Sequence, residues 1–444
     1  MRLVNIYKQA FVLLSFMTGV STIHAQEWTI QQCIDTAQQN NKNLQISENH
    51  VLIGQQREKE AKANLYPKIS ANADYKYFSN LPYQLLPLSA LNPTAPEGVY
   101  REAQFGVPHN INSNLQLTMP LYNSQVYGAI QISKIASEIT DLQLQKTEEQ
   151  IYFEITNLYY NAQVLYYQIS FLDSNLVNAE RLLKNMELLK QQLLAKGSDV
   201  NKVKLQVEQL ITQKETVKSK YTQVLNALKF TMGISLDRTI EITSKIEQGK
   251  AIEYARFSTL DMQLVSTQKK LLTNEFNNLN KSRFLPSLNL IATYGTTGFG
   301  YNGKPSSFLD FYPIGFAGLQ LSYPLFNGTV VLKKLAQKRI ELENNELQFN
   351  LVSEQNSMQV ANSNLQRLIA QKSIETVSNQ ITLAQLIYTQ TLQQQQQGTA
   401  SLTDVLLADN ALRESQQLYI TALVDYLKAD LELKKVTGNI SSIK

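Results

Sequence analysis

Four short segments of the chain alternate apolar and polar residues with a period of two. They are residues 68–77, 114–119, 287–294 and 319–323. In the first segment the apolar positions are Ile69, Ala71, Ala73, Tyr75 and Tyr77. Because successive side chains of a strand point to opposite faces, this pattern predicts strands with one apolar and one polar face. Each could extend to about ten residues, the length of a tilted membrane-spanning strand.

The strands form two pairs whose exits are nearly identical. Residues 115–123 read LQLTMPLYN and residues 319–327 read LQLSYPLFN, so six of the nine positions match. Stretches rich in Pro, Gly and Asn, about 79–111 and 298–314, separate the partners of each pair and predict loops. Aromatic residues near the strand ends favour a membrane sheet. The alternation alone is also compatible with a half-buried sheet in a soluble protein.

Two stretches of about 70 residues, 125–196 and 329–397, predict long helices. Their apolar residues recur at alternating intervals of four and three, which is the pattern of coiled-coil packing. In the first stretch these are Ile151, Ile155, Leu158, Ala162, Leu165, Ile169, Leu172, Leu176, Ala179, Leu183 and Met186. In the second they are Ala370, Ile374, Val377, Ile381, Ala384 and Tyr388. At 1.5 Å per residue each helix would be about 105 Å long.

Both long helices stop at a glycine followed by a hydroxyl residue. The pairs are Gly197-Ser198 and Gly398-Thr399. Glycine closes helices well and hydroxyl side chains cap the next helix, so we predict two helical hairpins here. Shorter helices would return over 199–232 and 401–437. Two more, about 28–64 and 256–283, would precede the strand pairs.

The order of predicted elements indicates an α+β membrane protein with a twofold internal repeat. The first repeat spans 26–232, with a strand pair at about 66–123, and a linker placed as an equatorial collar follows at 233–255. The second repeat spans 256–437, with a strand pair at about 286–327, and a tail covers 438–444. Four strands in lipid would leave edge groups unpaired at several kcal/mol each, so copies must combine. Two copies would give eight strands, and three would give twelve around an open bore.

The N-terminus predicts a secretory signal peptide over residues 1–25. Arg2 and Lys8 come before an apolar run at 10–20, and Ile23 and Ala25 stand at the −3 and −1 positions of a cleavage site. The mature chain would begin at Gln26, with no cysteine for lipid attachment.

Composition excludes several classes of function. Positive and negative residues are nearly balanced, 41 against 37, without the basic clusters of a nucleic-acid-binding protein. The single cysteine, Cys33, excludes an intramolecular disulfide and a cysteine-based metal cluster. The histidines His24, His50 and His109 lack metal-ligand spacing, and no nucleophile elbow or phosphate-binding loop is present. We therefore predict no enzyme, no cofactor and no catalytic or metal-binding residue.

Over essentially its whole mature length the chain resembles the TolC-like outer membrane efflux proteins. The resemblance rests on the repeated strand and long-helix order, the P-L-[YF]-N exits, and GTASLTDVLLADNAL at 398–412. The last segment is similar to the family's G-x-x-[ST]-x-x-D-V-L-x-A tip motif, whereas the first tip, 196–210, lacks Asp-Val-Leu. The resemblance implies a homotrimer with a twelve-stranded barrel in outer-membrane lipid and a periplasmic tunnel of helices.

The resemblance also implies a function and partners. The chain would be the outer-membrane duct of a tripartite efflux or type I secretion system, docked to an inner-membrane transporter through a periplasmic adaptor. The alternative is a periplasmic coiled-coil adaptor or scaffold without a barrel. That alternative accounts for the helices but leaves the strand pairs unexplained.

The tips and one aspartate are the candidate functional residues. We predict an adaptor-docking end that comprises Gly197, Ser198, Asp199, Gly398, Thr399, Ala400 and Ser401. The simpler interpretation is that the glycines only cap helices. The resemblance implies a pore constriction at Asp404, where three copies would place three carboxylates around the bore. Alternatively, Asp404 only stabilises the start of its helix through the helix dipole. Asp409 is a secondary candidate that we expect to face solvent.

The family pattern is incomplete around this aspartate. Leu407 stands where members often carry a second aspartate, and Ala400 replaces an arginine found in some members just after the tip glycine. We therefore do not expect a latch formed by that arginine.

Overall fold

The computed structural model describes residues 27–90, 94, 96–243, 253–301, 310–326 and 328–440. The predicted signal peptide and its cleavage site after Ala25 lie outside the described residues. The chain divides into two compact units. The bundle unit comprises Met1–His50, Asp141–Leu264 and Phe349–Lys444, and the sheet unit comprises Val51–Thr140 and Val265–Gln348.

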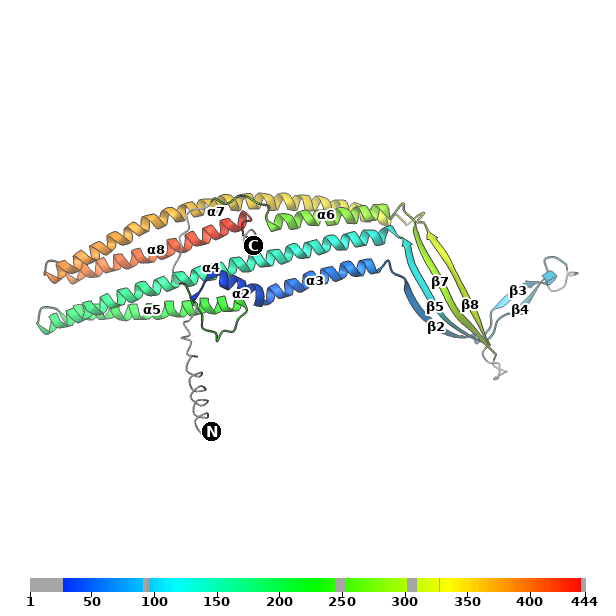
Figure 1. Cartoon of the computed structure of the whole chain (residues 1–444), viewed down its shortest axis with the longest axis horizontal. Helices are drawn as coiled ribbons and strands as arrows, with labels where there is room; N and C mark the ends of the chain where they lie inside the picture. Colours follow the sequence, from blue (N-terminus) through cyan, green and yellow to red (C-terminus); the bar gives the residue numbers. More distant parts are fainter. Residues whose placement is uncertain are drawn as a thin grey trace, which may run out of the picture. The chain divides into compact units, whose positions relative to one another are not determined.

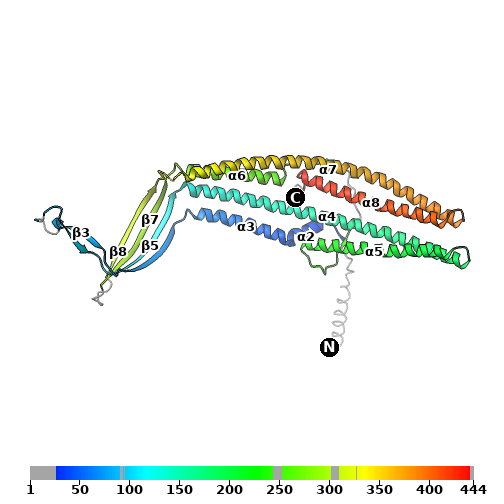
Figure 2. The ribbon, with the colours of Figure 1, turned by 180° about the vertical axis from the view of Figure 1, so that it is seen from behind.

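Helices make up most of the described chain (Figures 1 and 2). The long helices are α4 (Ser124–Gln191) and α7 (Val330–Gln396), with 68 and 67 residues. Each is followed by a return helix, α5 (Gly197–Met232) or α8 (Leu402–Val436). The remaining helices are α2 (Ile30–Asn40), α3 (Lys42–Ala63), α6 (Leu260–Lys281) and the short 3-10 turn η1 (Leu88–Ala90).

The helix predicted over 28–64 is in fact two helices, because the chain bends at Asn41. The side chain of Asn41 donates to the Thr231 carbonyl at 2.6 Å and accepts from the Leu44 amide at 3.1 Å. This buried side chain therefore lies between the end of α2 and the start of α3. Its hydrogen bond to Thr231 connects this bend to α5. The sequence pattern missed the bend because the apolar positions continue across it.

The four predicted strands form one antiparallel sheet in the order β2-β5-β7-β8 (Figure 1). Their bounds are β2 (Lys68–Tyr77), β5 (His109–Tyr122), β7 (Ser287–Gly300) and β8 (Asp310–Ser322). The register places Ile69, Leu117, Ala292 and Ala317 in one row across the sheet. The predicted strands and their alternation are therefore confirmed.

The two faces of this sheet differ in chemistry. On the apolar face lie the rows that contain Ile69, Leu115 and Leu290. On the polar face, side chains hydrogen-bond from strand to strand: Asn112 donates to Asp74 at 3.2 Å and accepts from Thr297 at 2.9 Å. A sheet that needs both an apolar and a wetted surface suits a wall between lipid and water.

Both edges of the sheet are open in the described chain. Strand β2 pairs only with β5, and β8 pairs only with β7. Each edge therefore presents a row of backbone N–H and C=O groups that has no strand beside it.

The first of the two predicted loops contains a second hairpin. Strands β3 (Tyr83–Pro87) and β4 (Tyr100–Gln104) pair antiparallel within the stretch that the Pro and Asn content had assigned to loop. The alternation of Tyr83 and Leu85 was too short to register as a strand. The second predicted loop lies partly outside the described residues, at 302–309.

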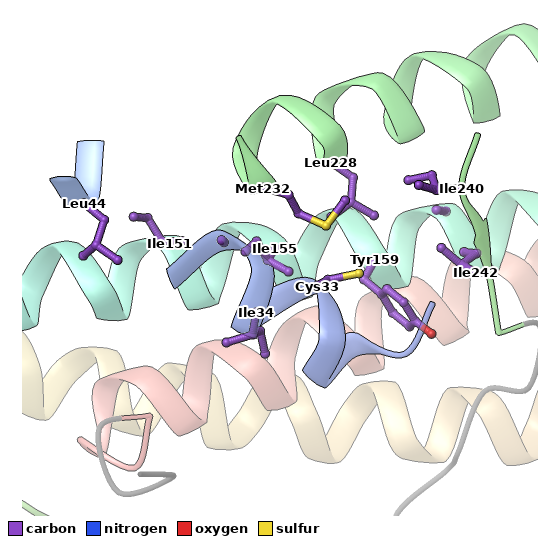
Figure 3. Packing of buried hydrophobic residues seen from close by; sticks show 12 residues of the cluster. Cys33, Ile34, Leu44, Ile151, Ile155, Tyr159, Leu228, Met232, Ile240 and Ile242 are labelled. Atoms are coloured by element: carbon purple, nitrogen blue, oxygen red, sulfur yellow. The ribbon is translucent and has the colours of Figure 1, made fainter. Parts of the chain in front are cut away.

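The predicted heptad pattern forms the core of the bundle unit. Residues Ile151, Ile155 and Ala162 of α4 join Cys33, Leu228 and Met232 in one buried cluster (Figure 3). Beside it, β1 (Glu27–Trp28) pairs in parallel with β6 (Glu241–Ile242), within the first part of the predicted linker. Cys33 is fully buried in this cluster as a packed apolar residue, and its burial raises the pKa of the thiol to about 12.

Candidate functional site: the helix tips and the seam behind them

All four long and return helices meet near the tips. A buried cluster contains Leu182 and Met186 of α4, Val200 and Val203 of α5, Ala384 and Tyr388 of α7, and Val405, Ala408 and Leu412 of α8. The two hairpins therefore share one apolar core behind their turns. This core determines where the candidate residues of each tip are held.

The second tip closes as its sequence predicts, with one change of role. Gly398 has a left-handed conformation with φ of 76°, which a glycine adopts without strain. The Thr399 hydroxyl does not cap the next helix: it donates back to the Gln394 carbonyl at 3.0 Å. The capping residue is Ser401, whose side chain accepts from the Asp404 amide at 3.2 Å.

Asp404 completes this cap. Its carboxylate accepts from the Ser401 amide at 2.9 Å and from the Ser401 hydroxyl at 2.6 Å, which forms a capping box. These hydrogen bonds lower the pKa of the Asp404 carboxyl. The side chain is exposed, so the aspartate stays charged at neutral pH and accessible to solutes. Its capping role is established, and its role at a constriction remains a prediction.

The first tip closes differently from the sequence-based prediction. Helix α4 already ends at Gln191, and the left-handed residue of the turn is Leu193, with φ of 63°. Gly197 lies inside α5, whose first residue it is, and Lys196 at the cap position provides no side-chain hydrogen bond. Ser198 is exposed, and Asp199 pairs with Lys202 at 3.2 Å.

Two exposed leucines at this tip were not among the predicted docking residues. Leu193 is 94% exposed and Leu194 is 72% exposed. The corresponding residues before the second tip are glutamines, so only the first of the two turns has exposed leucine side chains. The signal was available in the sequence, since two adjacent leucines stand immediately before this tip, where the second tip has glutamines.

Asp409 is buried, which corrects the expectation that it faces solvent. Its side chain accepts from Gln206 of α5 and forms an ion pair with Arg413, Nε to Oδ2, at 3.0 Å. The residue lies four positions after Val405 and three before Leu412, so it occupies the buried seam of α8. Burial raises the pKa of this carboxyl, while Arg413 and Gln206 oppose the rise.

The bond between Asp409 and Gln206 is one of several polar links between the two hairpins. Asn175 of α4 donates to Gln416 of α8 at 2.8 Å in a buried position. Gln168 donates to Gln417 at 2.9 Å near the surface. These links set the register of the first hairpin against the second.

Comparisons with known proteins agree on one family. The model of the family described as "Outer membrane efflux protein" matches residues 273–439. The outer membrane protein TolC of Salmonella enteritidis is 20% identical over 447 residues, which cover 96% of this chain and 84% of TolC.

Solved outer-membrane channels share the fold. The structure of VceC from Vibrio cholerae has a TM-score of 0.72 at 16% identity and covers 92% of this chain and 96% of VceC. The CmeC outer membrane channel of Campylobacter jejuni has a TM-score of 0.73 at 13% identity, with 92% and 85% covered.

The chain therefore shares the fold of these solved channels, a mixed architecture of long helices and strands. The family model over residues 273–439 and the likeness to TolC along 96% of the chain make this chain similar to the outer membrane efflux proteins. Among the described residues, no helix combines the length and apolar character needed to cross a bilayer. Likewise, no cluster of three potential metal ligands occurs in the described part of the chain.

Proposed function

We propose that three copies of this chain close a twelve-stranded barrel and continue it as a tunnel of helices across the periplasm. The observation that carries the proposal is the four-stranded sheet with two open edges and one apolar face. In lipid those edges would be costly unless β2 of one copy paired with β8 of the next. Three copies of four strands make twelve, which leaves an open bore.

The exposed surface of α7 supports association of copies. Within the bundle unit, eight large apolar residues of this helix are between 44 and 58% exposed, and six of them share one face: Leu351, Met358, Leu365, Ile369, Leu383 and Ile387. Successive members are separated by four, seven or fourteen residues, so they lie along a heptad stripe. A neighbouring copy of the chain would cover this stripe with its own helices.

The matching lengths of corresponding elements support the proposed twofold repeat. Helices α3 and α6 both have 22 residues, α4 and α7 have 68 and 67, and α5 and α8 have 36 and 35. Each half would contribute one strand pair and one helical hairpin. The predicted domain boundaries follow from this division.

Cysteine crosslinking tests the trimer directly. One cysteine is placed in β2 and one in β8 of a Cys33→Ser chain, and the pairing register is scanned. Three strand spacings, about 14 Å, separate the two edges within one sheet, so disulfides between them can join only different copies. We expect dimers and trimers on non-reducing gels. A control pair in β5 and β7 should crosslink within one chain, and the absence of all intermolecular products would refute the barrel.

The duct would serve a tripartite efflux or type I secretion system, with the tips as the docking end. Each hairpin turns back there, and an adaptor with helical hairpins could extend the same coiled-coil packing. The exposed Leu193 and Leu194 add an apolar contact to the predicted residues. The partners would be a periplasmic adaptor and, through it, an inner-membrane transporter.

A double replacement of Leu193 and Leu194 by serine is expected to reduce adaptor docking at least tenfold. Two exposed leucines can bury enough apolar area for about 2–3 kcal/mol, and losing them leaves the fold intact. The measurement is the amount of adaptor crosslinked in envelopes, identified by mass spectrometry. Serines at Gln394 and Gln395 of the other tip provide the control. Undiminished adaptor recovery from the leucine variant would contradict this contact, and bulky residues at Ser198 and Thr399 should block assembly as well.

A constriction at Asp404 predicts altered conductance when the charge is removed. Like carboxylates around a narrow bore attract cations, so a multivalent cation should block the wild-type channel. Asp404→Asn removes the charge but keeps an acceptor for the Ser401 cap, and it should weaken the block at least tenfold in planar bilayers. Asp199→Asn removes a tip charge from the other hairpin as a control. If block and conductance are the same in Asp404→Asn and wild type, Asp404 serves only as a cap.

A further inference from the structure

The polar face of the sheet carries a group of apolar side chains, most of them on β8. Tyr312, Ile314 and Phe316 of β8 lie opposite Thr297, Gly295 and Thr293 of β7. Residues opposite each other in a register point to the same face, so these three belong to the polar face. They are 56, 52 and 54% exposed. Together with Phe299 of β7 they form what we call the apolar stripe.

The stripe is continuous along the strand. Alternate residues of a strand are about 6.6 Å apart, so the stripe extends about 13 Å from Tyr312 to Phe316. The rings of Phe299 and Tyr312 are 5.9 Å apart and tilted by 47°. Beside Ile314 stands Gly295, which has no side chain to cover it.

The remainder of the polar face has a different composition. On β2 this face carries Lys68, Ser70, Asn72, Asp74 and Lys76, and on β5 it carries Asn110, Asn112, Asn114, Gln116 and Thr118. A membrane anchor does not require the stripe, because the opposite face of β8 already has Phe311, Leu319 and Leu321. The stripe is therefore an apolar surface on a face whose side chains on β2 and β5 are all polar.

The aromatic side chains of the two faces also differ in how they pack. On the apolar face, a Cβ added at Gly298 would lie 2.7 Å from the Phe311 ring, and one at Gly315 would lie 3.1 Å from the Tyr294 ring. These two rings cover glycines of their own sheet. Tyr312 has a ring contact with Phe299, and Phe316 is more than half exposed, so the stripe keeps apolar surface available to a solute. Exposed apolar patches with a polar surround mark binding surfaces.

We propose that the apolar stripe is a binding site for cargo on the barrel wall, and that it takes organic solutes with an apolar or aromatic body. The inference rests on the proposed function, because the polar face lines a bore only if copies close the barrel. Each copy would contribute one stripe, so three sites would surround the bore. The bound solute would lie flat along β8 between wetted strands.

The chemistry of the stripe selects this class of solute. Its side chains offer ring faces and a branched aliphatic group, which attract apolar bodies and organic cations and provide no ligands for an inorganic ion. Asp310 of β8 lies opposite Phe299 in the register and adds a negative charge on the same face. An aromatic cation matches both features.

Planar-bilayer recordings of the purified full-length protein test the site with tetraphenylphosphonium as the probe. We expect concentration-dependent reduction of the current through the wild-type channel, and much weaker reduction by tetramethylammonium, which has the same charge and no rings. Replacing both Tyr312 and Phe316 by serine should weaken block by tetraphenylphosphonium about tenfold. Phe311→Ser alters the other face of the same strand and should leave the block unchanged.

The possible outcomes distinguish failure of the proposed binding site from failure of the proposed channel. Normal conductance with equal block of wild type and the Tyr312/Phe316 variant would overturn the binding site and leave the barrel standing. A variant with unchanged block and a less stable oligomer would also overturn it, and would assign the stripe to contacts between copies. If the wild-type chain forms neither a heat-sensitive oligomer nor a conducting pore, the proposed function itself fails.

Discussion

Gly295→Ala is expected to remove most of the heat-sensitive oligomer from the outer membrane, whereas Gly318→Ala should leave it in place. A Cβ at Gly295 would lie 2.2 Å from the Ser113 carbonyl oxygen and 2.6 Å from the Asn114 Cα. Both atoms belong to the backbone of β5, so the strands themselves would have to move apart. Overpacking of this kind costs about 1–3 kcal/mol per site, and a trimer contains the site three times.

The control is the Gly318→Ala variant. Gly318 lies in β8 of the same sheet, and no atom lies within 4 Å of an added Cβ there. The measurement is the temperature at which the oligomer dissociates in detergent, together with the amount in outer-membrane fractions. The prediction fails if the two variants dissociate at the same temperature as the wild-type protein.

Asp409→Ala is expected to destabilise the bundle unit by about 2–4 kcal/mol. The replacement leaves Gln206 without its acceptor and Arg413 without its ion pair at the seam between the hairpins. The Arg413 side chain is 22% exposed, so it can reach water after the replacement. The decrease in unfolding free energy is therefore smaller than for a fully buried ion pair. Glu414→Ala, one turn further on the exposed side of α8, should change stability by less than about 0.5 kcal/mol.

The pH dependence of Asp409→Asn has a defined sign. The folded protein raises the pKa of Asp409 through burial, so it binds this proton more tightly than the unfolded chain does. Above the raised pKa the ionised, buried carboxylate destabilises the folded state. This destabilisation decreases as the pH falls toward the ordinary aspartate pKa of about 4, because the carboxyl becomes protonated. We expect the wild-type melting temperature to rise relative to Asp409→Asn over this range. A difference that is independent of pH would contradict the sign.

Periodicity in the sequence was enough to predict the regular elements. Ile155 and Val377 lie where the heptad pattern places buried residues, and the register of Ile69 with Leu117 follows the predicted alternation. These predictions succeed because burial depends on which face a residue occupies, and that face follows from spacing alone. The same spacing rule, applied to Val405, Asp409 and Leu412, would have placed Asp409 in the seam.

The irregular parts depend on tertiary contacts that spacing does not contain. The bend at Asn41 forms because its side-chain amide donates a hydrogen bond to the carbonyl of Thr231, 190 residues later. The first turn closes at Leu193 rather than at Gly197, although a left-handed conformation is unfavourable for leucine. Ser401 instead of Thr399 caps α8, because only Ser401 stands three residues before an acidic partner.

The open edges of the sheet have a genetic consequence. If each barrel closes only through contacts between β2 and β8 of different copies, a chain that folds but carries one defective edge would still enter oligomers through its other edge. With equal amounts of normal and defective chains, only about one trimer in eight would be entirely normal. Such an allele would be dominant, while an allele that abolishes folding of the chain would be recessive. The inheritance pattern of strand mutations therefore reports on the order in which folding and closure occur.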